Sequence, residues 1–143
     1  MNRYAAGRSY MQVAMQTAPP GQLVLMLYEG AIRFLERALL GFSSDDPAEF
    51  NQAINNNVQR AQMILDELNA ALDVKQGGEL AERLRGIYHY FERRLQESNL
   101  RKEPDGIEEV IRRLGVLRDA WREMLTRGGQ TEGQVVAELG ALG

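Results

Sequence analysis

Hydrophobic positions recur with helical spacing in four segments of the chain, and prolines, glycines or turn residues separate these segments. Proline suits the first turn of a helix, and glycine often follows its last turn. No segment shows the alternating pattern of a strand. Short connections favour antiparallel neighbours, so we predict an all-α fold, an antiparallel four-helix bundle with a short N-terminal cap segment. The predicted helices run from about 20 to 41, 47 to 73, 79 to 99 and 104 to 127.

The same pattern divides the chain into a cap or plug segment (1–18), the bundle (19–127) and a flexible Gly-rich tail (128–143). In the cap segment, Tyr10, Val13, Ala14 and Thr17 share one face of a helix. A segment of this length is not stable as an isolated helix, so it is held weakly wherever it packs. It is either an ordinary N-terminal arm or a detachable plug that covers an apolar groove until a partner displaces it.

The first predicted helix has more apolar surface than a bundle core requires. Its apolar positions cover an arc of roughly 200° at about 100° per residue, whereas a core-facing stripe needs little more than about 100°. Met26 even falls within the polar strip of this helix. Two compatible interpretations remain: the helix is buried against both neighbours, or one of its flanks lines a groove for another chain.

Two polar residues fall within the apolar arcs of later helices. Asn57 lies among apolar residues of the second helix, and Arg118 lies among those of the fourth. A buried polar group needs a partner. Each residue is therefore expected either to form a hydrogen bond that fixes helix register, or to face a groove and bind a partner's backbone or carboxylate.

Composition excludes several classes of function. The net charge of −3 has the wrong sign for a nucleic-acid-binding surface. The chain contains no cysteine, which excludes disulfides and fits a reducing cytosol. No apolar run approaches the ~18 residues of a membrane span, and the N-terminus has no apolar signal region. We therefore expect a soluble cytoplasmic protein without membrane insertion.

Signals for catalysis or cofactor binding are weak. His89 is the only histidine, and its projection places it on a solvated face, so a His-rich metal site is excluded. Gly77 and Gly78 lack the strand and spacing of a phosphate-binding loop. We expect no catalytic residue, no metal and no cofactor. A small helical enzyme would become plausible with a buried pair of carboxylates in a pocket.

Three stretches together resemble the flagellar secretion chaperone family, FliS: "TAPPGQLVLMLYEGAIRFL", "AQMILDELNAALDVKQGGELAERLRGIYHYFERRL" and "IEEVIRRLGVLRDAWREM". The similarity covers about residues 8–125. It implies an antiparallel four-helix bundle without catalytic activity. It also implies a protein that binds the C-terminal segment of flagellin in the cytoplasm, keeps flagellin from polymerising early, and helps deliver it to the flagellar type III export apparatus.

The resemblance also implies a set of candidate flagellin-binding residues, although the motifs do not separate contact residues from residues that build the fold. To this set we add the two polar residues within apolar arcs, Asn57 and Arg118. The residues that match the family motif are Tyr10, Val13, Thr17, Ala18, Pro19, Gln22, Leu23, Met26, Leu27, Tyr28 and Gly30. The alternative function is a structural adaptor whose first helix forms a homodimer; for the chaperone we expect a monomer or weak homodimer.

Overall fold

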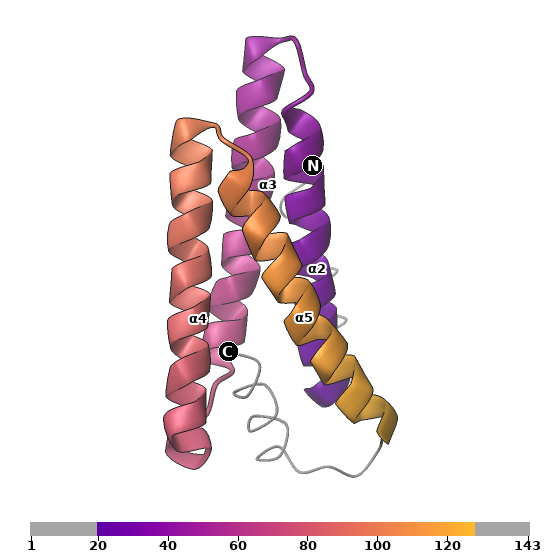
Figure 1. The fold of residues 1–143 in the computed structure, drawn as a ribbon, viewed down its shortest axis with the longest axis vertical. Coiled ribbons are helices and arrows are strands. Elements are labelled where there is room, and N and C mark those ends of the chain that lie inside the picture. The colour runs from indigo at the N-terminus through magenta and orange to yellow at the C-terminus, as the bar shows by residue number, and fades with distance from the viewer. Residues whose placement is uncertain (1–19, 128–143) are drawn as a thin grey trace, which may run out of the picture.

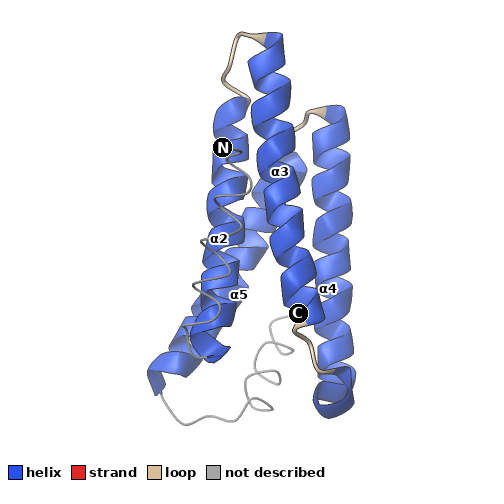
Figure 2. Ribbon diagram, turned by 180° about the vertical axis from the view of Figure 1, so that it is seen from behind, coloured by secondary structure: helices blue, strands red, loops and turns tan. Residues whose placement is uncertain are grey.

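The computed structural model describes residues 20–127. They form the helices α2 (Pro20–Gly41), α3 (Pro47–Ala70), α4 (Val74–Arg101) and α5 (Asp105–Arg127). Each helix packs against the next, and α5 packs against α2, so the four form a closed ring. Successive helices run in opposite directions (Figure 1), and short loops join them (Figure 2). The predicted antiparallel four-helix bundle is therefore confirmed, while the predicted cap and tail lie outside the described residues.

An N-cap residue and a proline define the start of α3. Asp46 is the N-cap residue, and its Oδ1 accepts a hydrogen bond from the backbone N–H of Ala48 at 3.0 Å. Pro47 occupies the first turn, where its missing N–H leaves no bond unmade. The helix ends at Ala70, three residues before the predicted end at Asp73.

The start of α4 differs from the prediction. The helix begins at Val74, because the side chain of Asp73 caps it by accepting a hydrogen bond from the N–H of Gln76 at 3.2 Å. Gly78 then interrupts the helix with φ 55° and ψ −132°, a conformation that side chains disfavour and glycine tolerates. The predicted break at Gly78 is confirmed. The predicted start of this helix, after Gly78, was wrong, because the turn before Gly78 is also helical and is capped by Asp73.

Large apolar side chains from all four helices fill the centre of the ring. Each such side chain stabilises the fold by about 1.5–3 kcal/mol through burial. The core also contains one polar pair: the hydroxyls of Tyr28 and Tyr88 lie 2.7 Å apart and share a hydrogen bond. Burial raises the pKa of both phenols, that of Tyr88 to about 12, so both remain neutral at physiological pH.

A polar cluster joins α4 to α5. Glu109 accepts hydrogen bonds from the Tyr90 hydroxyl at 2.7 Å and from Arg94 Nε at 2.8 Å, and it pairs with Arg113 Nε at 2.9 Å.

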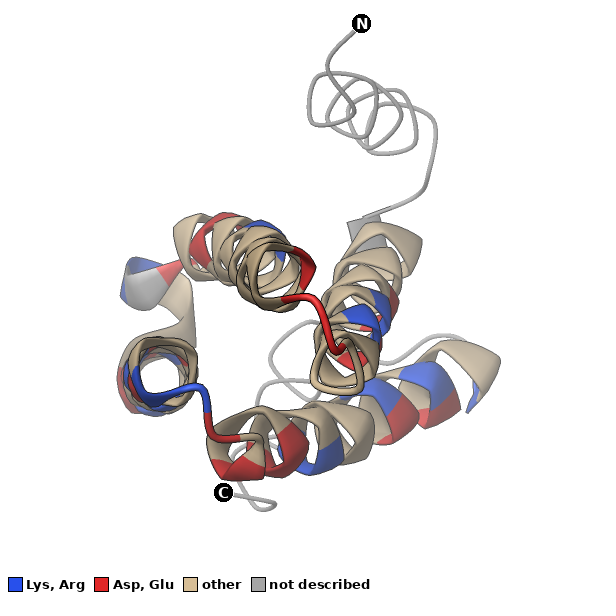
Figure 3. Cartoon of the chain, turned by 90° about the horizontal axis from the view of Figure 1, so that it is seen from above, with Lys and Arg blue, Asp and Glu red and all other residues tan. Residues whose placement is uncertain are grey.

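Viewed along the bundle, basic and acidic segments alternate along α5, whereas α2 shows few charged segments (Figure 3). The charged residues of α2 are Glu29, Arg33, Glu36 and Arg37.

Candidate functional site

The helix α2 packs against both α3 and α5. Its close contact with α3 depends on small residues: a Cβ on Gly30 would lie 3.3 Å from Ile64 Cδ1, and one on Gly41 would lie 3.0 Å from the Ala53 Cβ. The interpretation of α2 as a buried inner helix is therefore correct for most of its apolar arc. The buried apolar residues of α2 are Leu25, Leu27, Tyr28, Ala31, Ile32, Leu35 and Ala38.

Part of the apolar arc of α2 is not fully covered. Leu23, Met26 and Phe34 are half-buried, whereas Gly30 between them is buried. These positions recur every three or four residues and therefore share one face of the helix. We call these four residues the α2 strip. It joins two half-buried residues of the predicted apolar arc, Leu23 and Phe34, with Met26 from the polar strip, and its side chains are partly available for contact with another chain. Other apolar residues of α2 are also incompletely covered: Val24 and Leu39 are half-buried and Leu40 is 73% exposed.

Arginines surround one end of the α2 strip. The guanidinium carbon of Arg37 lies 5.5 Å from the centre of the Phe34 ring, and that of Arg60 on α3 lies 5.6 Å from it. These are cation–π distances, and they place Phe34 at the border between α2 and α3. Arg33, one residue before Phe34, is exposed. The strip is therefore apolar along its length and positively charged near Phe34.

The beginning of α2 is anchored to the end of α5. Trp121 Nε1 donates a hydrogen bond to the backbone carbonyl of Gly21 at 2.7 Å. Gly21 also packs closely against Leu125 of α5, since a Cβ there would lie 2.5 Å from Leu125 Cδ2. Arg122 pairs with Glu29 of α2 at 3.1 Å. These contacts fix the start of α2 against the end of α5, two residues before Leu23.

The predicted site residues on α2 differ in how accessible they are to a partner. Gln22 is exposed, and Leu23 and Met26 are half-buried members of the α2 strip. Leu27 and Tyr28 are buried in the core, where a partner on the surface does not reach them. Gly30 lies in the strip but is buried against Ile64. The remaining predicted residues, Tyr10, Val13, Thr17, Ala18 and Pro19, lie outside the described residues.

The two polar candidates have different surroundings. Asn57 is half-buried and donates through Nδ2 to the carbonyl of Ala53 at 2.8 Å, a bond within α3 that does not fix the register between helices. Its Oδ1 is buried without a partner in the described part of the chain. Asn57 shares the α2-facing side of α3 with Arg60 and Ile64, three and seven residues later.

Arg118, by contrast, lies on α5 with its side chain 30% exposed. Its Nε pairs with the neighbouring Asp119 at 3.0 Å, so its bonding partner is on its own helix. The structure thus brings Asn57 to the α2–α3 border and does not bring Arg118 there.

Reasoning from the sequence did not select one residue of the strip and two arginines beside it. Phe34 belongs to the apolar arc and Arg37 to the polar strip of the first predicted helix, but neither of them, nor Arg60, is among the predicted site residues. For Phe34 a signal existed, because it continues the helical spacing of Leu23 and Met26. The position of Arg60 depends on how α3 is aligned with α2, which periodicity alone does not determine.

The chemistry of the described residues is limited. His89 is exposed, as expected, and residues 20–127 contain no group of three side chains able to hold a metal ion. Burial and the nearby carboxyl of Asp66 raise the pKa of Glu92 to about 8, but Asp66 is exposed, so the two do not form the buried pair of carboxylates that an enzyme would need. Among the described helices, none has the length and hydropathy required to cross a membrane.

A helical bundle with a partly exposed apolar strip on one helix is typical of proteins that bind an amphipathic segment of another chain. Residues 1–128 match the family model described as flagellar protein FliS. The chain therefore belongs to the FliS family of flagellar secretion chaperones, and it is a chaperone and not an enzyme.

Several characterised relatives support this assignment. The chain is 34% identical over 124 residues to the flagellar secretion chaperone FliS of Bacillus subtilis, covering 87% of this chain and 86% of the relative. It is 36% identical over 121 residues to the FliS chaperone of Salmonella typhimurium, covering 82% and 87%. It is also 36% identical over 124 residues to that of Campylobacter jejuni, covering 87% and 94%.

Proposed function

We propose that this chaperone binds the C-terminal segment of flagellin in the cytoplasm, with the α2 strip as a main contact surface. Binding keeps flagellin from polymerising early and aids its delivery to the flagellar type III export apparatus. The observation that carries this proposal is the row of half-buried apolar side chains on α2, Leu23, Met26 and Phe34, in a chain of the FliS family.

The geometry of the strip suits an amphipathic client segment. Such segments bind through apolar anchors spaced by three or four residues, which is also the spacing of the strip. A client that is disordered before binding loses about 2–5 kcal/mol or more of the interaction energy on ordering. Additional apolar contact offsets this cost, and the flexible side chain of Met26 adapts to an imperfect fit.

We also propose that residues 1–18 cover the α2 strip when no client is bound. The contacts of Trp121 and Leu125 with Gly21 fix where this segment joins the bundle, next to Leu23. Deleting residues 1–17 should then tighten or accelerate client binding, as measured by calorimetry and stopped-flow fluorescence. If binding is lost instead, Tyr10 and Val13 are contact residues and the segment is not merely a cover.

Titration calorimetry with a peptide from the C-terminal segment of the same organism's flagellin tests the main proposal. The wild-type chain should bind the peptide, and absence of binding at tens of micromolar peptide would overturn the proposal. Replacing Met26 with Asp places a charge in the strip and should weaken binding at least about tenfold, since burying an unpaired charge is costly. Val116→Asp is the matched control: Val116 is 47% exposed on α5, outside the strip, and its replacement should leave affinity unchanged.

A further inference from the structure

Three arginines gather at the Phe34 end of the α2 strip. The guanidinium carbons of Arg37 and Arg60 lie 5.5 Å and 5.6 Å from the centre of the Phe34 ring. Arg33 lies four residues before Arg37 on the same face of α2, and both are exposed. Like charges grouped around one side chain repel each other, so this end of the strip favours the approach of an anion.

The acidic residues of α2 do not pair with the two arginines of this helix. Within the described helices, neither Arg33 nor Arg37 forms an ion pair with a carboxylate. Glu36 is exposed, three residues after Arg33 and next to Arg37. Glu29 pairs instead with Arg122 of α5 at 3.1 Å. The positive charge of this face of α2 is therefore left for a group from outside the described helices.

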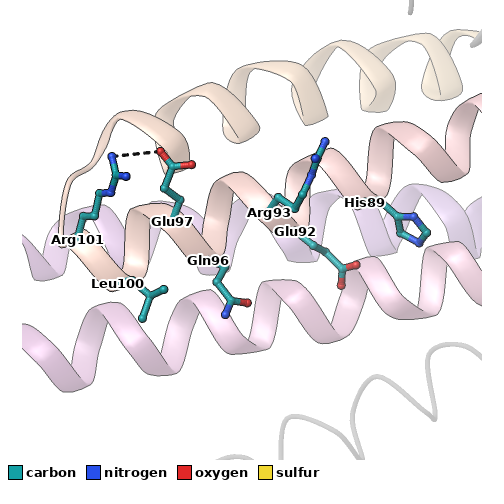
Figure 4. A pocket seen from close by; sticks show the side chains of 7 residues that line it. All are labelled: His89, Glu92, Arg93, Gln96, Glu97, Leu100 and Arg101. Atoms are coloured by element: carbon teal, nitrogen blue, oxygen red, sulfur yellow. Dashed lines mark ion pairs between the residues drawn. The ribbon is translucent and has the colours of Figure 1, made fainter.

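Several arginines of α4 and α5, by contrast, pair with an acidic residue of their own helix. Arg113 pairs with Glu109 at 2.9 Å. Arg101 pairs with Glu97 at 3.5 Å, beside a cavity of about 510 Å³ that both residues line (Figure 4). The arginines of α2 also do not stabilise the end of their helix through its dipole, because its last turn contains no basic residue.

The segment that we propose as a cover for the strip supplies no opposite charge. Residues 1–19 contain Arg3 and Arg8 and no aspartate or glutamate. A cover of this composition leaves Arg33 and Arg37 without a carboxylate, whereas a client that carries one gains an interaction that the cover lacks. At this end of the strip, charge therefore favours the exchange of the cover for the client.

We propose that Arg33 and Arg37, together with Arg60, bind an aspartate or glutamate side chain of the client. This inference rests on the proposed function and specifies the client further: its acidic side chain lies three or four residues from the apolar anchor that contacts Phe34. Guanidinium groups suit this role because their planar fork of N–H donors matches a carboxylate. Contact with the Phe34 ring already restricts Arg37 and Arg60, which lowers the entropy lost on binding.

Titration calorimetry with the flagellin peptide, in about 50 mM and about 500 mM sodium chloride, tests this inference. The double variant Arg33→Gln with Arg37→Gln removes two charges and keeps polar residues that favour a helix. At low salt it should bind the peptide about three- to tenfold more weakly than the wild type, as expected for two partly exposed ion pairs. High salt should weaken binding to the wild type more than binding to the double variant.

The matched control is Arg93→Gln with Arg112→Gln. Both arginines are exposed, on α4 and α5, and the guanidinium carbon of Arg93 lies 6.0 Å from the centre of the Tyr90 ring, much as that of Arg37 lies near Phe34. The control removes the same charge outside the strip, and its affinity should stay within about twofold of the wild-type value.

Peptide variants identify the carboxylate that binds. Replacing each aspartate or glutamate of the peptide by its amide should reveal one position that weakens binding to the wild type and has little effect on the double variant. Amidation of the peptide's C-terminus should leave affinity unchanged, because the helical spacing of the strip assigns the contact to a side chain. A loss of affinity on amidation alone would overturn that assignment in favour of the terminal carboxylate.

A carboxylate from the chain's own C-terminal tail is a separate outcome. The tail contains Glu132 and Glu138. The full-length variant Glu132→Gln with Glu138→Gln should bind the peptide as the wild type does. Tighter binding would show that these glutamates occupy the arginines, which overturns the assignment to the client.

The same titrations separate this inference from the proposed function. If the wild type does not bind the peptide, the proposed function fails and the inference fails with it. If the wild type binds, but with an affinity that neither salt nor the double substitution changes, only the inference is overturned. The salt dependence of the wild type tests it without any substitution, and circular dichroism checks that the double variant is folded.

Discussion

At the scale of single residues, the few polar groups inside the bundle determine which contacts are specific. Tyr28 and Tyr88 come from α2 and α4, which lie opposite each other in the ring, and their hydroxyls are each other's hydrogen-bond partner. Apolar packing tolerates some displacement, whereas a buried hydroxyl without a partner costs about 1–3 kcal/mol. The tyrosine pair therefore favours one alignment of α2 and α4 over its alternatives.

The tyrosine pair yields a prediction for a double-mutant cycle. Tyr28→Phe should lower the free energy of unfolding by about 1–3 kcal/mol, because it leaves the Tyr88 hydroxyl buried without a partner, and Tyr88→Phe should act similarly. The double variant should cost clearly less than the sum of the two single changes. Urea unfolding followed by circular dichroism measures all four proteins, and additive effects would show that the two hydroxyls do not depend on each other.

At the scale of helices, periodicity and proline signals in the sequence predicted most of the architecture. The bounds of α2 and α5 were predicted closely, because Pro20 and Pro104 mark their starts and the apolar spacing is regular. The projection of the third helix also predicted the exposure of His89. It did not predict which turns face each other, so the contacts of Glu109 with Tyr90 and Arg94 could not be foreseen.

Two glycines on the α4–α5 pair should respond in opposite directions to replacement with alanine. A Cβ on Gly106 would lie 2.6 Å from the carbonyl oxygen of Arg94, and a backbone atom cannot move aside without separating the helices. Gly106→Ala should therefore destabilise the bundle, by about 1–3 kcal/mol for overpacking. Gly86 is exposed within α4 and has nothing within 4 Å of its Cβ position, so Gly86→Ala should stabilise the helix by up to about 1 kcal/mol. In thermal unfolding, the midpoint should fall for Gly106→Ala and rise for Gly86→Ala.

The cluster around Glu109 should make the bundle sensitive to acid. The hydrogen bonds from Arg94 and Tyr90 hold the pKa of Glu109 below its usual value, so its contribution is present above the unfolded pKa and is lost as the pH falls through the folded one. Glu109→Gln should lower the free energy of unfolding at pH 7 by about 1.5–3 kcal/mol, since it weakens bonds to a charged group.

The same variant should also lose less stability than the wild type between pH 6 and pH 3. The neighbouring Glu108 is exposed, so Glu108→Gln serves as its control and should keep the wild-type acid profile. Urea unfolding at pH 7, 5, 4 and 3 gives the comparison. Equal slopes for the wild type and the Glu109 variant would mean that the cluster does not stabilise the ionised carboxylate.

At the scale of the whole molecule, stability and binding place opposite demands on α2. The helix packs against both α3 and α5, and its core residues are buried. Its strip of Leu23, Met26 and Phe34 is only half-buried, which leaves apolar surface for another chain at little cost to the core. The same surface suits either a client segment, as we propose, or α2 of a second copy in a homodimer.

Measurements of molecular mass and of thermal stability together show whether a client segment or a second copy of the chain occupies the α2 strip. If the client is the occupant, light scattering should give the same monomeric mass at two protein concentrations about tenfold apart. Client peptide at about 100 times its dissociation constant should then stabilise the fold by about 2.7 kcal/mol, because a ligand that binds only the folded state shifts unfolding by mass action. At the same peptide concentration Met26→Asp, with affinity at least about tenfold weaker, should reduce this stabilisation to about 1.4 kcal/mol or less without changing the mass. A homodimer through α2 predicts the reverse: a dimeric mass that persists on dilution, a midpoint of unfolding that rises with protein concentration, and a monomeric Met26→Asp variant.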